Sequence, residues 1–286
     1  MELTRRRVKA PADGRPINLY PLGDIHLGAA ACDIEDFRRT VQTIAADPNA
    51  IWLGMGDYGD LIMPSDPRWA FSGHDWKNLG FANGKPGISN LGVEHRDLIE
   101  RELAPIKDKC IGLLYGNHEH AFSRYYFIDI ARYLADKFKV PMLGYTALVR
   151  LEVEISRGPK AHHETWPLTI FAEHGATGGG TDGNAINSLQ KRAVEFEADV
   201  YLKGHVHKYG ISQRTELCWG PKELLTHDRI FMLTGSYLKG YSEFEVTYGE
   251  RKGYPPNEIG GGVVILDPKD RRIHAMSVGA KGALAA

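Results

Sequence analysis

Five short segments of the sequence place carboxylate, amide or imidazole groups directly after an apolar run. They read Asp24-x-His26, Gly56-Asp57-x-x-Asp60, Gly116-Asn117-His118-Glu119, His174-Gly175 and Gly204-His205-x-His207. Oxygen and imidazole donors without a thiolate favour Mn, Fe, Zn, Ni or Co over a structural tetrahedral zinc site or a calcium site. Seven of these residues are candidate metal ligands: Asp24, His26, Asp57, Asn117, His174, His205 and His207. Seven ligands are too many for one metal, whereas two adjacent metals that share a carboxylate would use them all.

The apolar runs before these motifs are predicted strands, and amphipathic segments alternate with them. Strands are expected at 17–26, 50–60, 110–120, 168–175 and 198–207, and later at 229–237, 261–267 and 272–278. Helical periodicity marks 33–46, with Asp33 as the expected N-cap, and also 91–106, 124–138 and 184–196. This alternation predicts an α/β fold, in which ligand sites gather beyond the carboxyl ends of strands. The five motifs are therefore expected to meet at one edge of the sheet structure.

The bulk composition is that of an ordinary soluble globular protein. Hydrophobic residues make up 43% of the 286 and charged residues 25%, and the net charge of -1 excludes a global basic field for collecting nucleic acid. The cluster of Arg5, Arg6, Arg7 and Lys9 is interpreted as a short solvated arm. Three scattered cysteines indicate neither a disulfide framework nor a zinc pair. With no secretory signal and no apolar stretch of membrane-spanning length, a reducing, cytoplasmic compartment is expected.

In their order and spacing, the five motifs resemble those of the calcineurin-like metallophosphoesterase superfamily. The resemblance runs from about residue 17 to 207. It implies a four-layer αββα sandwich, in which two mixed sheets are flanked by helices and a dinuclear metal site lies at the sheet edge. It also implies an enzyme, a hydrolase that acts on phosphoric ester bonds. Mn2+ is the first expectation for the two divalent metals, with Fe, Zn, Ni, Co or Mg as alternatives.

Residue roles carry over from the family by position. Asp24, His26 and His207 correspond to ligands of one metal, and Asn117, His174 and His205 to ligands of the other. Asp57 would bridge the two metals, and a hydroxide between them would be the nucleophile.

His118 stands in the family's Asn-His dipeptide, whose histidine is not a ligand. It would protonate the leaving group or stabilise charge on a nonbridging oxygen. In the phosphoprotein-phosphatase branch the second Asp of the GDxxD motif orients this histidine, so Asp60 is a candidate catalytic partner; the alternative is a turn residue that caps the loop after Asp57. His120 and Arg124 are candidate substrate-binding residues, with an ordinary turn residue and a surface arginine as alternatives. Glu119 is expected to support the site.

Sequence departures from individual branches narrow the expected substrate. Leu61-Ile62 stands where the phosphoprotein-phosphatase pattern has Arg-Gly, and Tyr58 does not match the spacing of the purple acid phosphatases. The Gly-His-x-His ending is shared with the phosphodiesterase and nuclease branches. Hydrolysis of phosphodiesters, by a nuclease or a nucleotide phosphodiesterase, is therefore predicted. The alternatives are a phosphomonoesterase acting on small molecules or phosphoproteins, and a non-catalytic scaffold on the same fold.

One domain is expected over 1–280, followed by a tail at 281–286. A segment rich in glycine, proline and aromatic residues interrupts it at about 61–90. This insertion is interpreted either as a lid on the substrate side, whose rings could stack bases, or as an ordered loop packed on the flank. The strands between 209 and 278 are expected to complete the second sheet. Gly116 is expected to permit a sharp turn. The sequence carries no signal for an oligomeric state.

Overall fold

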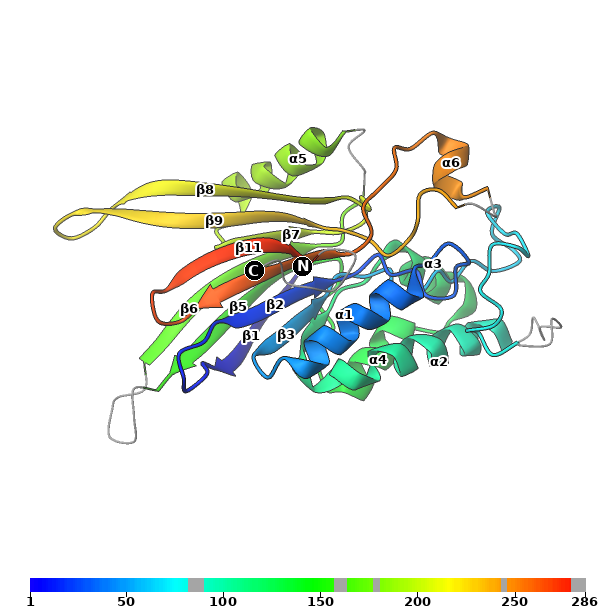
Figure 1. Cartoon of the computed structure of the whole chain (residues 1–286), viewed down its shortest axis with the longest axis horizontal. Helices are drawn as coiled ribbons and strands as arrows, with labels where there is room; N and C mark the ends of the chain where they lie inside the picture. The colour runs from blue at the N-terminus through cyan, green and yellow to red at the C-terminus, as the bar shows by residue number, and fades with distance from the viewer. Residues whose placement is uncertain (82–89, 157–163, 177–180, 243–245, 279–286) are drawn as a thin grey trace.

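Two mixed β-sheets form the centre of the protein (Figure 1). The computed structural model describes residues 1–81, 90–156, 164–176, 181–242 and 246–278. The five-stranded sheet has the order β11-β10-β2-β3-β4, with β2 (Ile17–Leu22), β3 (Ala50–Gly54), β4 (Cys110–Leu113), β10 (Gly261–Asp267) and β11 (Arg272–Val278). The six-stranded sheet has the order β1-β5-β6-β7-β9-β8, with β1 (Glu2–Lys9), β5 (Thr146–Ile155), β6 (Glu164–Glu173), β7 (Val200–Lys203), β8 (Tyr209–Trp219) and β9 (Leu224–Thr234).

Helices cover the outer faces of the two sheets. Against the five-stranded sheet lie α1 (Ile34–Ala46), α2 (Leu91–Leu103), α3 (Asn117–Tyr126) and α4 (Ile130–Phe138), together with the 3-10 turn η2 (Ala104–Lys109). Against the six-stranded sheet lies α5 (Asp182–Glu195), and the short α6 (Tyr248–Lys252) follows β9. The described part of the chain contains no helix with the length and apolar character that a membrane crossing requires.

Three hydrophobic clusters fill the three interfaces between the four layers. Successive strand residues point to opposite faces, so Tyr20 and Trp52 pack towards the helices while Leu19 and Leu53 pack between the sheets. In the same way, Phe171 of β6 packs against α5, whereas its neighbours on the strand face the other sheet. The predicted αββα sandwich of two mixed sheets is thus confirmed.

Strand direction determines where the polar motifs lie. β2, β3 and β4 are parallel to one another, and β6, β7 and β9 are parallel to one another in the other sheet. Each of the five predicted strands that lead into a motif is present, although each ends before the motif residues begin. Because the carboxyl ends of parallel strands share one edge, the segments after β2, β3, β4, β6 and β7 can meet there.

The late strands do not all join the sheet that the sequence suggested. β8 and β9 complete the six-stranded sheet, but β10 pairs antiparallel with β2, Val264 lying opposite Leu19, and carries β11 with it. The prediction that residues 209–278 complete a single sheet was therefore wrong. Alternating hydrophobicity marks a strand but does not choose its partner, since either sheet would bury the same apolar face.

The N-terminal segment is an edge strand rather than a solvated arm. β1 pairs parallel with β5, and Val8 packs against the core between the sheets. Arg5 and Arg7 both pair with Glu152 on β5, at 3.1 and 2.9 Å. Burial alternates along 2–9, with Thr4, Arg6 and Val8 half-buried, but only Val8 of these is apolar, so the residue types did not mark a strand.

Two helices occupy the stretch that periodicity assigned to a strand end and to one helix over 124–138. α3 begins at Asn117, directly after its N-cap Gly116, and the chain breaks at Phe127, whose φ is 56°. Asp129 then caps α4 by accepting a hydrogen bond from the backbone N–H of Arg132. Asp33 caps α1 as predicted, through the backbone N–H of Asp36. The GNHEH segment therefore opens a helix instead of ending a strand.

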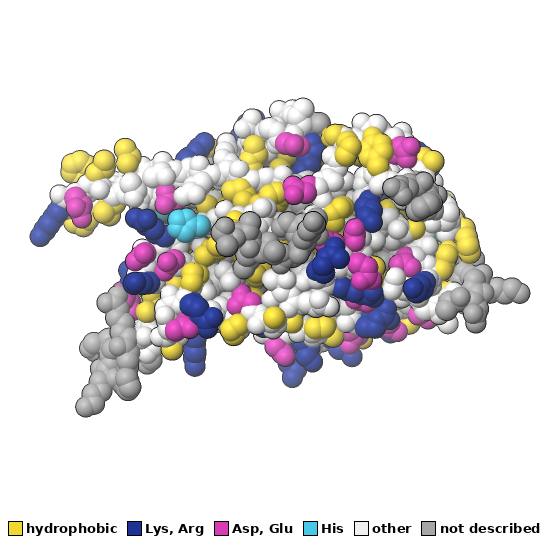
Figure 2. All heavy atoms as spheres, viewed as in Figure 1, with side chains coloured by type: hydrophobic (Ala, Val, Ile, Leu, Met, Phe, Trp, Pro, Cys, Tyr) yellow, Lys and Arg dark blue, Asp and Glu magenta, His cyan; other side chains and the backbone are white. Residues whose placement is uncertain are grey.

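The β8–β9 hairpin projects beyond the body of the molecule. Figure 2 shows hydrophobic side chains along this projection, at the left of the view. Near its tip Trp219 is 93% exposed, and Leu217 and Leu224 are also exposed. This hairpin lies on the outer edge of the six-stranded sheet.

The described part of the insertion, 61–81, is an ordered loop held by its own aromatic rings. His74 is buried, and its two ring nitrogens each lie 2.9 Å from a backbone carbonyl, that of Ala70 or that of Ile62. Its ring stacks on Trp76 and lies 4.3 Å from the ring of Trp69. Trp69 and Trp76 pack on His74 and on the helix-side core, while Phe71 is 54% exposed. The rest of the predicted insertion, 82–89, lies outside the described residues.

Candidate metal centre

The structure brings all seven candidate ligands together at the carboxyl ends of the strands. Six of them form two groups whose ligand atoms lie within 4.8 Å of one another and which share Asp57, and Asn117 adjoins the second group; a third such group joins His26 to Asp60 and His118. The first group contains Asp24, His26, Asp57 and His207; the second contains Asp57, His174 and His205. The five-stranded sheet supplies Asp24, His26 and Asp57, while the six-stranded sheet supplies the other three histidines. The cluster therefore exists only where the two sheets are packed together.

In the first group, two imidazole nitrogens and a carboxylate oxygen face one another. His26 Nε2 lies 3.1 Å from His207 Nε2, which lies 3.5 Å from Asp24 Oδ1. Asp24 is fully buried, and its Oδ1 has no hydrogen-bond partner. Leaving such an oxygen unsatisfied is costly. A divalent cation would satisfy these lone pairs together, so the donor set fits a metal ion.

The second group shows the same arrangement around His174. Its Nδ1 lies 2.7 Å from the Met55 carbonyl, which can only accept, so Nδ1 carries a hydrogen. Its Nε2 then faces Asn117 Oδ1 at 3.1 Å and Asp57 Oδ2 at 3.4 Å. His205 Nδ1 lies 2.7 Å from the same Asn117 oxygen. A proton on Nε2 or a metal ion between Nε2 and these oxygens would make the contacts favourable. The hydrogen bond to the Met55 carbonyl fixes the ring orientation, as a backbone carbonyl commonly does for metal-binding histidines.

Backbone strain is concentrated at the candidate ligands. In the described part of the chain nine non-glycine residues have positive φ, and five of them are Asp24, His26, Asp57, His205 and His207. Their φ values lie between 47° and 67°. This region costs a side-chain-bearing residue free energy and persists only where the surrounding structure enforces it, commonly at functional sites. The strain is independent of the motif spacing, and it falls on five of the seven candidate ligands.

Asp57 is held by a buried carboxylate that the sequence motifs did not assign a definite role. Glu119 accepts four backbone N–H groups, from Asp57, Tyr58, Gly59 and Gly116, at 2.7 to 3.2 Å. It is the third residue of α3, the position at which a capping-box carboxylate reaches back to the N-cap N–H. That pattern was the available signal for its role.

Gly116 is required for close approach rather than for a turn. Its φ of -96° is open to any residue, so the expectation of a sharp glycine turn was wrong. A Cβ there would lie 2.0 Å from Asp57 Oδ1 and 2.1 Å from the Asp57 nitrogen. The Asp57 carboxylate thus occupies the space that a side chain would fill, where it also accepts the backbone N–H of His118 at 3.0 Å.

Neighbouring histidines hold the pKa values of the buried Asp24 and Asp57 below their ordinary value, whereas burial and the charge of Asp57 raise the pKa of Glu119 to about 7. Burial alone raises the pKa of Asp57, but the charges of His118 and His174 outweigh it and hold that pKa well below its ordinary range. Burial likewise lowers the pKa of His174, whereas the charge of Asp57 and its contact raise it, to a net value of about 9. In the same way Asp24 raises the pKa of His207 against the effect of burial.

The Asp60 side chain serves a different histidine from the one predicted. His118 Nδ1 donates to the backbone carbonyl of Asp60 and lies 3.9 Å from its carboxylate. The carboxylate is nearer to His26, with Oδ1 3.4 Å from Nδ1. The backbone carbonyl of Asp60 therefore orients His118, while the Asp60 carboxylate faces the candidate ligand His26. Carboxylates are common partners of metal-binding histidines. Motif spacing places the residue but cannot distinguish its carbonyl from its carboxylate.

His120 and Arg124 both lie exposed on α3. The ring of His120 lies 5.4 Å from the ring of Tyr145, which in turn lies 6.2 Å from the ring of His174. Tyr145 therefore lies between His120 and the candidate centre. Arg124 lies in the last turn of the helix, whereas the candidate centre is at its first turn. The first turn of α3 thus carries the motif residues, and the structure does not draw these two into the cluster.

Sequence reasoning missed three further residues that contact the centre. Ser236, which follows β9, is fully buried, and its hydroxyl donates to the Asp24 carbonyl at 2.8 Å. Tyr237 donates its backbone N–H to the same carbonyl at 3.0 Å. A sixth strand ending in Thr-Gly-Ser was the signal. In addition Arg68, in the insertion, lies beside His118 with 3.4 Å between Nη1 and Nε2.

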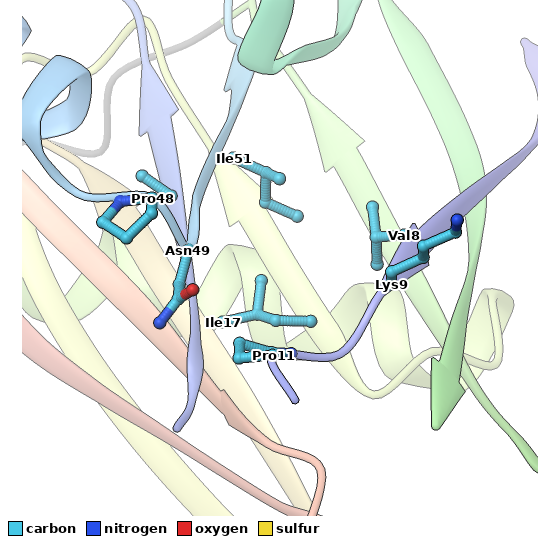
Figure 3. A pocket seen from close by; sticks show the side chains of 8 residues that line it. Val8, Lys9, Pro11, Ile17, Pro48, Asn49 and Ile51 are labelled. Atoms are coloured by element: carbon cyan, nitrogen blue, oxygen red, sulfur yellow. The ribbon is translucent and has the colours of Figure 1, made fainter. Parts of the chain in front are cut away.

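A hollow of about 360 Å³ lies at the amino ends of β2 and β3. Figure 3 shows side chains that line it. Ile17 and Ala50, at the amino ends of β2 and β3, line it together with Val8 and Ile51. The motif residues follow the other ends of the same strands. The hollow therefore contains none of the candidate ligands, and chemistry rather than cavity size locates the site.

Comparisons with known proteins do not assign this chain to a family. No family model and no curated protein matches the chain. A similar solved structure is that of a conserved uncharacterized protein, a predicted phosphoesterase, from Streptococcus pneumoniae TIGR4. The similarity covers 92% of this chain and 98% of that chain, at 13% identity and a TM-score of 0.34. A similarity at this score carries no argument, and the description of the fold and centre rests on the chain itself.

Metal binding is predicted to release protons. His174, with a pKa of about 9, carries a proton at neutral pH, and a metal that takes its Nε2 lone pair must displace it. Affinity for Mn2+ should therefore rise with pH up to about 9, roughly tenfold per pH unit for each displaced proton. Titration calorimetry in buffers of different ionisation enthalpy measures the number released. His227→Gln, at the other end of the sheets, should leave it unchanged, and a buffer-independent heat would contradict the prediction.

Glu119→Gln is predicted to destabilise the fold. The amide supplies one acceptor oxygen and turns an N–H2 group towards two buried N–H donors, and leaving these unsatisfied costs about 2–5 kcal/mol in all. Denaturant unfolding of the metal-free protein measures the loss. Glu35→Gln is the matched control, since the Glu35 side chain is 70% exposed and pairs only at the surface with Arg38. Equal unfolding free energies for Glu119→Gln and the wild type would show that the four hydrogen bonds to Glu119, the Glu119 clamp, do not stabilise the loop at Asp57.

Proposed function

We propose that this chain is a metal-dependent phosphoesterase that hydrolyses phosphodiester bonds, as a nuclease or a nucleotide phosphodiesterase. One observation carries the proposal: two groups of ligand-type side chains share the single carboxylate of Asp57 beside His118. Two adjacent metals with a shared carboxylate suit in-line displacement at phosphorus. The order of the five motifs, which resembles that of the calcineurin-like metallophosphoesterases, supports the same reaction class.

The chain's own residues divide the work of such a site. Asp24, His26 and His207 would hold one metal, with Asn117, His174 and His205 at the other and Asp57 common to both. Bound there, the metals would supply charge neutralisation and water activation. The pKa of Asp57 lies far enough below neutral pH for it to remain an acceptor throughout the physiological range.

His118 is the proposed acid for the leaving oxygen. It is 8% exposed, and its ring lies edge-on to that of His26 with 4.7 Å between the ring centroids. Because Nδ1 donates to the Asp60 carbonyl, Nε2 is the atom from which a proton can pass to a substrate. A histidine in hydrogen-bonding reach of the leaving oxygen is the common solution for this step.

A substrate panel tests the proposed reaction. Bis-p-nitrophenyl phosphate, p-nitrophenyl phosphate and labelled single- and double-stranded DNA are compared in the presence of Mn2+. The diester is expected to be cleaved faster than the monoester, and Asp57→Asn should lose bound metal and turnover together. Faster cleavage of the monoester would favour the phosphomonoesterase alternative. Intact metal binding without turnover of any substrate would contradict both enzyme hypotheses and favour the non-catalytic scaffold.

His118→Asn is predicted to keep the metal content while lowering kcat about 10²- to 10⁴-fold, the usual contribution of a general acid. Metal analysis and steady-state kinetics on the same preparation separate the two effects. His274→Asn, an exposed histidine on β11, is the matched control and should behave as wild type. Loss of metal from His118→Asn would make His118 a ligand and overturn its assigned role.

A further inference from the structure

The insertion brings a cation to the substrate-facing side of His118. Arg68 Nη1 lies 3.4 Å from His118 Nε2, the ring nitrogen on the opposite side from the Asp60 carbonyl. The Arg68 side chain is 39% exposed, whereas the side chain of His118 is 8% exposed. The guanidinium therefore lies at the solvent side of a buried imidazole, where a substrate must approach.

Asp66 determines which edge of the guanidinium faces the centre. Its two oxygens accept Arg68 Nε at 3.0 Å and Nη2 at 2.8 Å, a bidentate pair. The Asp66 carboxylate also accepts the backbone N–H of Arg68 at 2.8 Å. With Nε and Nη2 engaged in this way, the Nη1 edge is directed at His118. Asp66 thus holds the cation in one orientation.

The contact between Arg68 and His118 is long for a hydrogen bond, so little free energy is lost when a substrate oxygen replaces it. An N–H donor normally approaches its acceptor to about 2.9–3.0 Å, so 3.4 Å marks a weak interaction. A phosphoryl oxygen can only accept, and it would be bound by Arg68 Nη1 and by a His118 protonated at Nε2. An anion between the two side chains would therefore form stronger bonds than the ones it replaces.

The segment that carries Arg68 is braced at several points. Trp69 packs on His74, and Met63 is buried in the helix-side core. The Ser65 hydroxyl is hydrogen-bonded to that of Tyr126 at the end of α3, at 2.5 Å. Backbone bonds from Ala30 to Gly73 and from Asp75 to Gly28 tie the insertion to the loop after His26. Arg68 is consequently positioned by packed structure, which lowers the entropy lost when it binds an anion.

We propose that Arg68 binds a nonbridging oxygen of the phosphoryl group at the candidate metal centre, and that Asp66 is its positioning residue. The proposal rests on the proposed function. Leu61, an apolar side chain, occupies the position where the phosphoprotein-phosphatase pattern has an arginine, so the motif itself supplies no phosphate clamp. The insertion supplies a guanidinium from Arg68 instead. The ordered loop on the flank thereby also contributes to the substrate side.

Inorganic phosphate is the probe that tests this contact independently of turnover. Its affinity for the Mn2+-loaded protein is measured by calorimetry and as a competitive inhibition constant, beside KM, kcat and metal content. Arg68→Ala should weaken phosphate binding about 10- to 100-fold, as expected for loss of a charge-assisted contact, and should raise KM. Metal content should stay unchanged. Arg68→Lys should recover part of the affinity, since a lysine keeps the charge but not the fork geometry.

Asp66→Asn should also weaken phosphate binding, by less than Arg68→Ala, because the guanidinium remains but is no longer held in orientation. Arg15→Ala is the matched control. Arg15 makes the same local pair with Asp13, with 2.6 Å between Nε and Oδ2, in the loop before β2 at the opposite end of the sheets. It should leave phosphate affinity, KM and kcat at wild-type values.

Two failures are distinguishable. If the wild type cleaves no phosphoester, the proposed function is wrong, while the phosphate affinities of wild type and Arg68→Ala still decide whether Arg68 binds the anion. If the wild type is active but Arg68→Ala retains its phosphate affinity and its kcat/KM, the assignment of Arg68 is overturned and the proposed function stands.

Discussion

The candidate centre depends on one buried carboxylate, that of Glu119, which lies outside the groups of candidate ligands. Glu119 gathers four backbone N–H groups from two different loops and so joins the end of β3 to the start of α3. Against this clamp Gly116 lets Asp57 approach to a distance that no other residue would allow. Because Asp57 is the carboxylate common to both ligand groups, both groups depend on this contact. Its strained φ of 52° is enforced by the same set of bonds.

The packing of the two sheets brings the remaining candidate ligands to Asp57. His174 and His205 come from the six-stranded sheet, yet both contact Asn117, which opens a helix on the other side of the sandwich. The apolar core between the sheets, which is fully buried at residues such as Leu53 and Leu202, holds these elements in register. Burial of the polar cluster is tolerated because imidazoles and carboxylates offset one another's charge, shifting the pKa values of Asp57 and His174 in opposite directions.

Much of the fold and site could be predicted from local pattern. Asp33 as a helix cap and the seven ligand-type residues at strand ends were readable, because capping and strand period are local properties. Other features were not. The partner of β10, the edge strand β1 and the division of Asp60 between a carbonyl for His118 and a carboxylate for His26 all depend on which surfaces meet across the chain.

By itself, the sequence determined the chemistry that this edge of the sheets can carry. Residue types and their spacing specify oxygen and imidazole donors after parallel strands, and within each sheet the direction of the strands places those donors at one edge. Only the tertiary structure decided how they are used. It made Glu119 the clamp on Asp57, and it brought Arg68 from a loop without a motif to within 3.4 Å of His118. The physical reason is range: strand and helix periods act over a few residues, whereas these contacts join segments about 50 to 60 positions apart.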